Sequence, residues 1–195
     1  MIKIGILNLQ GAVSEHLDIT KKAIQNLNID GEAINVRYAD EVANCDGVII
    51  SGGESTVIGK IIKERGIDKV IKENNLPVFG TCAGMVLLAK KIDFNQPLLE
   101  IMDMEVKRNA FGSQKNSFET NISFLGEDFT GVFIRAPALK DYNKNNKDIE
   151  VLSTLDSQVI AIKQGANIAC SFHPELTDNT LIHEYYLNEV LKCVE

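Results

Sequence analysis

Several scarcities in this sequence restrict what the protein can be. It has no tryptophan, three histidines and four cysteines in 195 residues, and its apolar runs are short. None of them approaches the roughly 20 apolar residues that cross a membrane as a helix. The first nine residues, MIKIGILNL, resemble a buried strand and lack the apolar region and cleavage site of a signal peptide. We therefore expect a cytoplasmic protein that does not contact membranes.

The few cysteines also exclude two ways of stabilising a small fold. Without a secretory signal, the four cysteines (Cys45, Cys82, Cys170 and Cys193) are expected to be reduced thiols rather than disulfides. The sequence has no Cys-x-x-Cys pair and no Cys/His cluster with the spacing of a zinc site. We expect no bound metal.

Positive charge is scarce as well. The chain has 20 Lys and Arg against 27 Asp and Glu, a formal net charge of -7, and no basic stripe. Nucleic acid is therefore not an expected partner. The hydrophobic share of 45% is ordinary for a globular protein, and 195 residues can form one stable core. We expect one domain over residues 1–195.

The first half of the sequence alternates short apolar strands with helical patterns. Strands are predicted at 2–7, 32–36, 47–50 and 77–80, and helices at 14–27, 57–72 with a break near Gly66, and 83–91. This alternation predicts an α/β fold, an open and mostly parallel sheet of flavodoxin-like type with helices on both faces.

The second half changes character before it returns to the same pattern. Short alternating stretches between 102 and 138, such as 117–124 and 130–135, predict a short antiparallel insertion. A polar Asn-rich loop is predicted at 142–148. Strands follow at 151–153, 159–163 and 168–172, and an amphipathic helix at 178–194 ends the sequence.

The segment Gly80-Thr81-Cys82-Ala83-Gly84 is the most informative part of the chain. A predicted strand runs directly into it and a predicted helix follows, which is the context of a nucleophile elbow. The two glycines permit a sharp turn, and a helix N-terminus favours the reactive thiolate. A buried cysteine in a tight turn would have the same pattern, so the segment needs support from elsewhere.

That support comes from His173-Pro174-Glu175. Residues two apart in extended chain point to the same side, and Pro174 disfavours helical backbone at His173. A carboxylate beside an imidazole fixes its tautomer and stabilises its charged form, as in a catalytic triad. Alone, the segment would fit a surface turn after a core strand better than a catalytic pair. With Cys82, it indicates a Cys–His–Glu triad.

A third segment, Ser51-Gly52-Gly53-Glu54-Ser55, follows the predicted strand at 47–50. Ligands bind beyond the carboxyl ends of parallel strands, and adjacent glycines leave backbone N–H groups free to form an oxyanion hole.

Together these segments resemble the class I, triad-type glutamine amidotransferases. Further motifs resemble one family among them, the glutaminase subunit of pyridoxal 5′-phosphate synthase. They are Leu9-Gln10-Gly11-Ala12-Val13-Ser14-Glu15-His16, Gly52-Gly53-Glu54-Ser55-Thr56, Arg108-Asn109-Ala110-Phe111-Gly112, Gly131-Val132-Phe133-Ile134-Arg135-Ala136-Pro137 and Ser171-Phe172-His173-Pro174-Glu175-Leu176-Thr177. The resemblance covers nearly the whole chain.

The resemblance implies roles for individual residues. Cys82 would be the nucleophile, His173 the general base and acid, and Glu175 its orienting carboxylate. The backbone N–H groups of Gly53 and Ala83 would form the oxyanion hole. L-glutamine would be held by Gly53, Glu54, Ser55, Arg108, Ile134 and Arg135. An arginine suits an amino-acid substrate, because a guanidinium can hold a carboxylate by two hydrogen bonds; surface salt bridges are the alternative role for both arginines.

The resemblance also implies a partner. The ammonia would pass to the synthase subunit of pyridoxal 5′-phosphate synthase in a hetero-oligomeric complex, with no cofactor needed for glutamine hydrolysis. Gln10 and His16 would take part in activation by that partner. The alternative is that Gln10 is a polar helix-entry residue and His16 a solvated side chain. Two positions depart from the family pattern: Ser51 replaces a proline, which we expect to loosen its loop, and Ser113 replaces an arginine.

Two other functions fit parts of the sequence. A redox or stress-sensing protein could use Cys82 as an oxidisable thiol, but it would not need His173-Pro174-Glu175. An α/β-hydrolase usually has its acid between nucleophile and histidine, whereas Glu175 follows His173 here.

Overall fold

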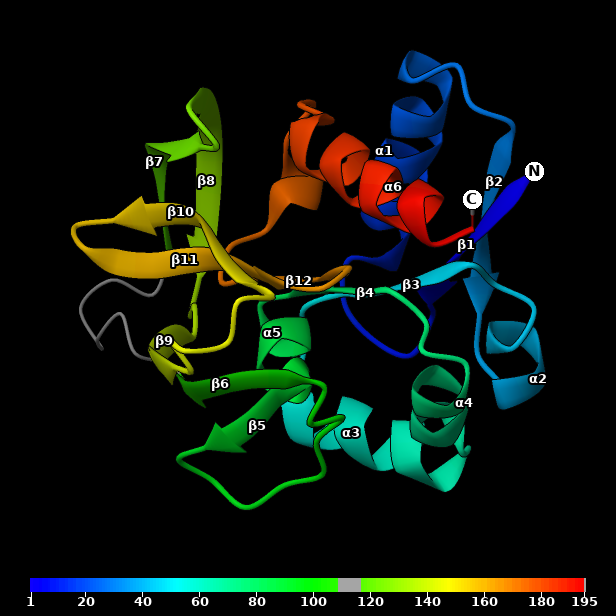
Figure 1. Cartoon of the computed structure of the whole chain (residues 1–195), viewed down its shortest axis with the longest axis horizontal. Coiled ribbons are helices and arrows are strands. Elements are labelled where there is room, and N and C mark those ends of the chain that lie inside the picture. Colours follow the sequence, from blue (N-terminus) through cyan, green and yellow to red (C-terminus); the bar gives the residue numbers. More distant parts are fainter. Residues whose placement is uncertain (109–116, 195) are drawn as a thin grey trace.

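A seven-stranded sheet forms the centre of the molecule (Figure 1). The computed structural model describes residues 1–108 and 117–194. The strand order is β10-β11-β12-β4-β3-β1-β2. Neighbours from β2 to β12 are parallel, and β11 and β10 add an antiparallel edge. The strands are β1 (Ile2–Leu7), β2 (Gly31–Val36), β3 (Gly47–Ile50), β4 (Val78–Thr81), β10 (Ile149–Leu155), β11 (Gln158–Gln164) and β12 (Asn167–Cys170).

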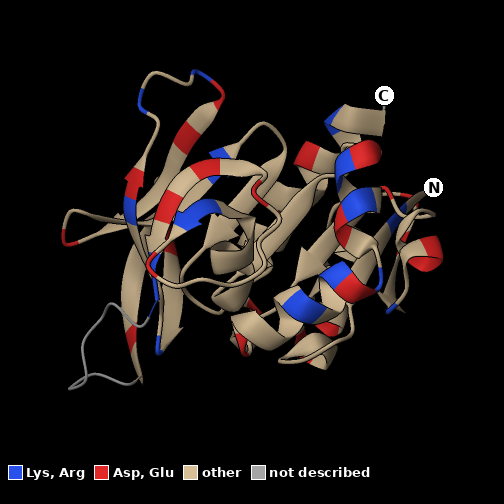
Figure 2. Cartoon of the chain, turned by 90° about the horizontal axis from the view of Figure 1, so that it is seen from below, with Lys and Arg blue, Asp and Glu red and all other residues tan. Residues whose placement is uncertain are grey.

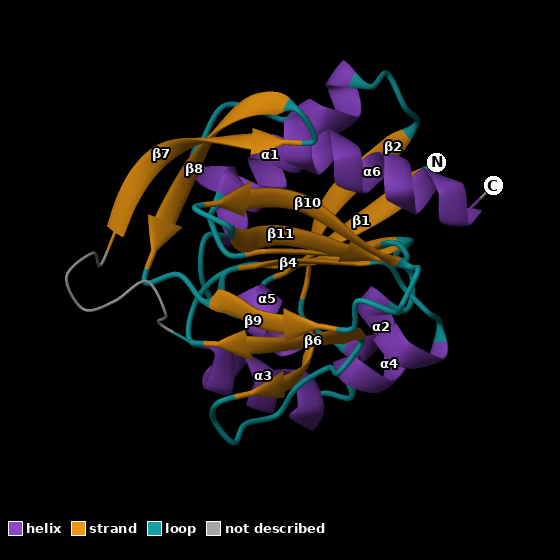
Figure 3. Cartoon of the chain, turned by 60° about the vertical axis from the view of Figure 1, so that its left-hand side comes forward, coloured by secondary structure: helices purple, strands orange, loops and turns teal. Residues whose placement is uncertain are grey.

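Helices cover both faces of this sheet (Figures 1 and 3). On one face lie α1 (Val13–Asn26) and α6 (Leu181–Val194). On the other lie α2 (Ala39–Val42), α3 (Ser55–Glu64), α4 (Ile67–Glu73) and α5 (Ala83–Leu88). Side chains alternate along each strand, so Ile49 and Phe79 belong to one apolar cluster and Val48 and Val78 to the other. The predicted α/β fold is confirmed.

Smaller sheets lie beside the central one. β7 (Ser117–Phe124) and β8 (Glu127–Ile134) form an antiparallel hairpin, as the alternating pattern predicts. β5 (Ala89–Ile92), β6 (Met102–Lys107) and β9 (Ala138–Tyr142) form a three-stranded sheet in which β5 and β6 are parallel. β9 therefore includes Tyr142, which was predicted to be the first residue of the loop at 142–148.

The predicted helices differ most from the structure at three places. The helix expected at 83–91 ends at Leu88, because Ala89 turns to extended backbone and pairs with Met102 in β6. Pairing with a distant strand outweighs local helical preference there. The last helix begins at Leu181 rather than 178, since the Asn179 side chain accepts the backbone N–H of Leu181 in a turn. The 3₁₀ helix η1 (Pro174–Leu176) was not expected either.

The charged residues are mixed over the molecule, with basic and acidic positions next to one another on many elements (Figure 2). Within the part of the chain that the structure describes, no helix is long and apolar enough to cross a membrane.

Candidate active site

Cys82 lies on a strained turn between β4 and α5. Its backbone has φ 51° and ψ −104°, a combination that side-chain-bearing residues rarely adopt. Such strain persists only where the surrounding structure enforces it, and it is common at catalytic residues. The backbone N–H of Cys82 donates to the carbonyl oxygen of Cys170 in the neighbouring strand β12 at 2.9 Å. The turn is therefore held to the sheet, as a nucleophile elbow requires.

The two glycines of this turn are there for close packing. A Cβ on Gly80 would come within 2.6 Å of the backbone carbon of Gly84, and a Cβ on Gly84 would overlap the carbonyl oxygen of Ile50. Helix α5 thus packs against β3 and β4 more closely than any side chain permits. The Gly-x-Cys-x-Gly pattern is explained by this approach.

His173 and Glu175 form a buried pair. His173 Nδ1 lies 2.8 Å from Glu175 Oε1, and the Glu175 side chain is inaccessible to solvent. The predicted contact is present, but the predicted extended path is only partly right: His173 is non-helical (φ −110°, ψ 84°), whereas Glu175 lies in η1. The 3₁₀ turn folds the carboxylate back onto the imidazole that precedes it.

The electrostatics of this pair suit proton transfer. Burial alone would lower the pKa of His173, but hydrogen bonds to Cys82 and Glu175 outweigh burial and raise it to about 10. Burial alone would raise the pKa of Glu175, yet His16 and His173 hold it below its usual value. An imidazolium at His173, between Cys82 and the Glu175 carboxylate, is the state that this arrangement favours.

The Gly52-Gly53 turn faces the cysteine from β3. A Cβ on Gly52 would lie 3.4 Å from the Cβ of Cys82, and Gly53 has φ 140°, a conformation open to glycine. The Gln10 side chain fixes this turn, because its Oε1 accepts the backbone N–H of Glu54 at 2.6 Å. Gln10 therefore lies at the carboxyl end of the sheet, beside the predicted oxyanion loop.

Ser51, one of the two departures from the family pattern, connects this loop to the Gln10 segment. It is buried, and its Oγ donates to the backbone oxygen of Gln10 at 2.7 Å. The serine adds a hydrogen bond between two loops that a proline could not make.

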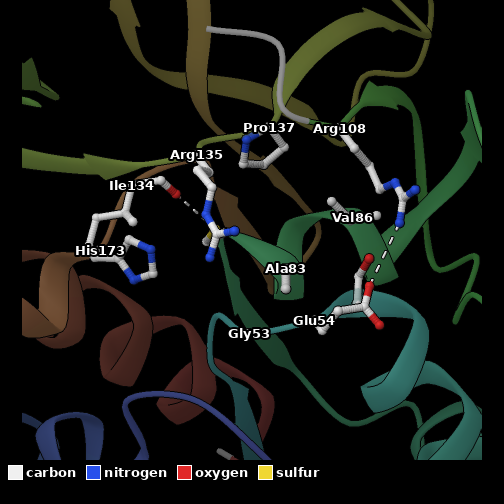
Figure 4. Close-up of a pocket in the computed structure, with 11 residues that line it drawn as sticks. Gly53, Glu54, Ala83, Val86, Arg108, Ile134, Arg135, Pro137 and His173 are labelled. Atoms are coloured by element: carbon white, nitrogen blue, oxygen red, sulfur yellow. Dashed lines mark hydrogen bonds and ion pairs between the residues drawn. The ribbon is translucent and has the colours of Figure 1, made fainter. Parts of the chain in front are cut away.

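A cavity of about 440 Å³ opens over the cysteine (Figure 4). A volume of this size is within the usual range for small-molecule sites. All the residues predicted to hold glutamine line it, together with Cys82 and His173. The lining is Gly53, Glu54, Ser55, Cys82, Ala83, Val86, Arg108, Ile134, Arg135, Pro137 and His173.

The charged side chains of the cavity differ in how they are held. Glu54 caps α3, accepting the N–H groups of Thr56 and Val57 at 3.1 and 2.9 Å. Burial would raise its pKa, but these bonds and Arg108 lower it. Arg108 Nη1 lies 3.8 Å from Glu54 Oε1 (Figure 4). The Arg108 guanidinium also lies over the Phe94 ring, 4.1 Å from its centroid. Within the described chain Arg135 makes no ion pair, so the salt-bridge alternative does not apply to it.

His16 occupies an environment that the sequence does not reveal. It lies on the buried face of α1, is 0% exposed and contacts Thr81, His183 and Glu175, so it is not a solvated side chain. A buried histidine cannot touch a partner directly. His183 was not among the predicted site residues, since a histidine on an amphipathic helix carries no local signal.

Some predicted features lie outside the described residues, namely 109–112 of the Arg108 motif and Ser113. In the part of the chain that is described, no three His, Cys, Asp or Glu side chains come together as a metal site.

A cysteine on a strand–helix turn, an adjacent histidine and a buried carboxylate define the class of cysteine-dependent acyl-transfer enzymes. Residues 6–192 match the model of the SNO glutamine amidotransferase family. The chain belongs to this family. It is therefore a glutamine amidotransferase, an enzyme that acts on the side-chain amide of glutamine.

Individual relatives agree over full length. A protein of Methanobrevibacter smithii named pyridoxal 5′-phosphate synthase subunit PdxT is 76% identical over 195 residues, covering 100% of both chains. A protein of the same name from Methanothermobacter thermautotrophicus is 55% identical, also over 100% of both. A crystal structure described as glutamine amidotransferase superposes with a TM-score of 0.85 at 40% identity, covering 96% of this chain and 98% of the other.

Proposed function

We propose that this chain is the glutaminase subunit of pyridoxal 5′-phosphate synthase. It hydrolyses L-glutamine to glutamate and ammonia, and it supplies the ammonia to a synthase subunit for vitamin B6 synthesis. The observation that carries the proposal is the strained Cys82 turn sharing one cavity with the His173–Glu175 pair. Membership of the amidotransferase family and the name shared by its full-length relatives support it.

In the first half-reaction the Cys82 thiolate attacks the side-chain amide carbon of glutamine. The backbone N–H groups of Gly53 and Ala83 stabilise the tetrahedral oxyanion. The His173 imidazolium gives its proton to the leaving nitrogen, ammonia departs, and a γ-glutamyl thioester is left on Cys82. Glu175 holds the imidazole ring by Nδ1, which leaves Nε2 for this transfer.

In the second half-reaction water replaces ammonia. Neutral His173 takes a proton from water, hydroxide adds to the thioester carbon, and the oxyanion is held by the same N–H groups. The carbon–sulfur bond then breaks, which releases glutamate and returns the thiolate–imidazolium pair. Every step uses groups of the chain, so no cofactor is needed.

Glutamine recognition is assigned to the charged walls of the cavity. Arg108 and Arg135 are assigned to the α-carboxylate of glutamine, and Arg135 has no ion-pair partner in the described chain. The ionised Glu54 is assigned to the α-ammonium group. Ser55 and Ile134 complete the wall around the side chain. The backbone oxygen of Ile134 lies 3.9 Å from Cys82 Sγ, so this strand end borders the reacting sulfur.

The synthase subunit is proposed to switch the glutaminase on within a hetero-oligomeric complex in the cytoplasm, with residues 1–195 acting as one domain. Ammonia released without an acceptor would escape to water and be protonated. Gln10 contacts the oxyanion loop, so docking near it could favour the competent loop conformation. About 3 kcal/mol of differential binding would change the population ratio more than a hundredfold.

The redox alternative leaves the His173–Glu175 pair without a role. Oxidation of a thiol requires access and thiolate character, but not an imidazole held by a buried carboxylate.

The decisive experiment measures glutamate formation by the chain with its synthase subunit. Wild type should hydrolyse glutamine and support pyridoxal 5′-phosphate formation, whereas Cys82→Ala should do neither from glutamine. Glutaminase activity that survives in Cys82→Ala would refute the assignment of the nucleophile. A wild-type complex without glutaminase activity, but with Cys82 readily oxidised, would favour the redox protein.

A further inference from the structure

Glu175 has a second buried neighbour besides His173. Its Oε1 contacts His173, and its Oε2 lies 3.3 Å from His16 Nε2; both the His16 and the Glu175 side chains are 0% exposed. The contact is within ion-pair range, although its alignment falls short of a standard hydrogen bond, since Oε2 has no hydrogen-bond partner by geometry. The catalytic mechanism above uses Oε1 only. The histidine at Oε2 therefore requires its own explanation.

His16 is itself held from two sides. Its Nε2 also lies 3.1 Å from Thr81 Oγ1, the residue just before the nucleophile, and its Nδ1 lies 3.0 Å from His183 Nε2. His16 comes from α1 and His183 from α6, the two helices that share one face of the sheet (Figure 1). The far nitrogen of His183, Nδ1, has no partner in the described structure.

These contacts determine where the protons lie. Burial lowers the pKa of both His16 and His183, although Glu175 opposes the shift at His16, so each ring is neutral at neutral pH. A neutral imidazole carries one N–H. A buried N–H without an acceptor is rarer than an unpaired acceptor, so the His183 proton belongs on Nε2, where His16 Nδ1 accepts it.

The His16 proton is then on Nε2. An unprotonated Nε2 would direct its lone pair at a carboxylate oxygen 3.3 Å away in a site without water exposure. A protonated Nε2 donates instead to Thr81 Oγ1 at 3.1 Å, and its positive N–H edge lies 3.3 Å from Glu175 Oε2. The N–H groups thus run in one direction, from His183 through His16 toward Thr81 and Glu175.

We propose that His16 is a positioning residue of this glutaminase, whose Nε2–H fixes the Glu175 carboxylate so that Oε1 stays on His173 Nδ1. His183 sets the tautomer of His16 from behind. This inference rests on the proposed function and deepens it, because it adds a second donor to the triad carboxylate from a helix remote in sequence.

Kinetics of three variants in the assembled complex test the proposal. His16→Leu removes the donor with little change of size, and kcat should fall about ten- to a hundredfold, the loss expected for a hydrogen bond to a charged group. The KM for glutamine should change less than about twofold by the same reasoning, since no substrate contact is lost. His16→Gln should recover most of the activity, because its amide N–H reaches the position of Nε2.

The matched control is Thr20→Val. Thr20 lies one turn further along α1, is 0% exposed, and its hydroxyl donates only to the His16 backbone oxygen. The variant removes a buried polar group from the same helix without approaching Glu175, so kcat should stay at the wild-type value even if the melting temperature falls. If His16→Leu and Thr20→Val lose activity equally, or if His16→Leu loses none, the proposal is overturned.

The pH dependence separates positioning from general damage. Losing the His16 donor disfavours the ionised carboxylate, so the pKa of Glu175 rises and the acid limb of kcat/KM moves to higher pH in His16→Leu. The titratable groups of the described chain that interact with Glu175 are His173 before η1, His16 on α1 and Cys170 on β12. His16→Gln and Thr20→Val should keep the wild-type limb. An unmoved limb in His16→Leu would count against the proposal.

A second test needs no enzymatic activity, so it distinguishes failure of this inference from failure of the proposed function. The chain has three histidines, so ¹⁵N-imidazole NMR spectra of the isolated protein can be assigned by substitution. His16 and His183 should both be neutral Nε2–H tautomers at neutral pH. An Nδ1–H tautomer at His16 would overturn the proposal, whatever the activity of the complex.

Discussion

The hydrogen bond from Glu54 N–H to Gln10 Oε1 gives the sharpest test of how the oxyanion loop is held. This bond is 2.6 Å long, and the Gln10 side chain also limits the space beside Gly53. Gln10→Ala removes both. Since the backbone N–H of Gly53 is proposed to stabilise the oxyanion in the transition state, we expect the loss to fall mainly on kcat, with little change in KM.

The magnitude follows from one neutral hydrogen bond. Such a bond contributes about 0.5–1.5 kcal/mol, which corresponds to about a two- to tenfold fall in kcat if the full amount is lost in the transition state. Gln10 is exposed, so water can replace part of the bond. Gln10→Met should behave like Gln10→Ala, whereas Gln10→Glu, which keeps an acceptor oxygen, should retain more activity.

The assay is glutamate formation by the chain alone and with its synthase subunit. Wild type should be a poor glutaminase alone and a good one in the complex, and Gln10→Ala should narrow that difference. Partner binding must be measured alongside, so that weak association is not mistaken for a poor oxyanion hole. Equal wild-type rates with and without the partner would refute the gate, and a Gln10→Ala variant that binds and activates normally would remove Gln10 from it.

Further predictions concern the triad and its support. With added ammonium, the Cys82→Ala complex should still form pyridoxal 5′-phosphate, since only ammonia supply is lost; failure would indicate a damaged synthase. His173→Asn should reduce kcat more than Glu175→Gln, because the imidazole moves protons in both half-reactions and the carboxylate only orients it; the reverse order would contradict these roles. Gly84→Ala should lower the free energy of unfolding by about 1–3 kcal/mol or more, since its methyl group overlaps the Ile50 carbonyl oxygen; an unchanged melting temperature would contradict the packing argument. The pKa of His173 is raised from 6.5 to about 10, so its contribution to stability is full below pH 6.5 and is lost as pH rises toward 10; denaturant titrations should show this loss in wild type and not in His173→Asn.

Much of the fold could be predicted because its signals are local. Buried parallel strands are short apolar runs, and the alternation of such runs with helical patterns specifies an α/β sheet. The failures occurred where distant residues compete with local preference. Ala89 leaves the helix to pair with Met102, and η1 turns Glu175 back toward His173. Residues adjacent in sequence indicate neither the strand pairing of Ala89 nor the turn at Glu175.

The sequence by itself determined the nucleophile turn and the candidate triad. Gly80, Cys82 and Gly84 lie within five residues, so the sharp turn between β4 and α5 can be recognised from the local sequence. The tertiary structure alone decided what lies behind the triad. His16 and His183 are separated by most of the chain, and they contact each other behind Glu175 only because α1 and α6 pack on the same face of the sheet. Burial then removes water from their nitrogens, and this desolvation lowers the pKa of both histidines beside the proposed triad carboxylate.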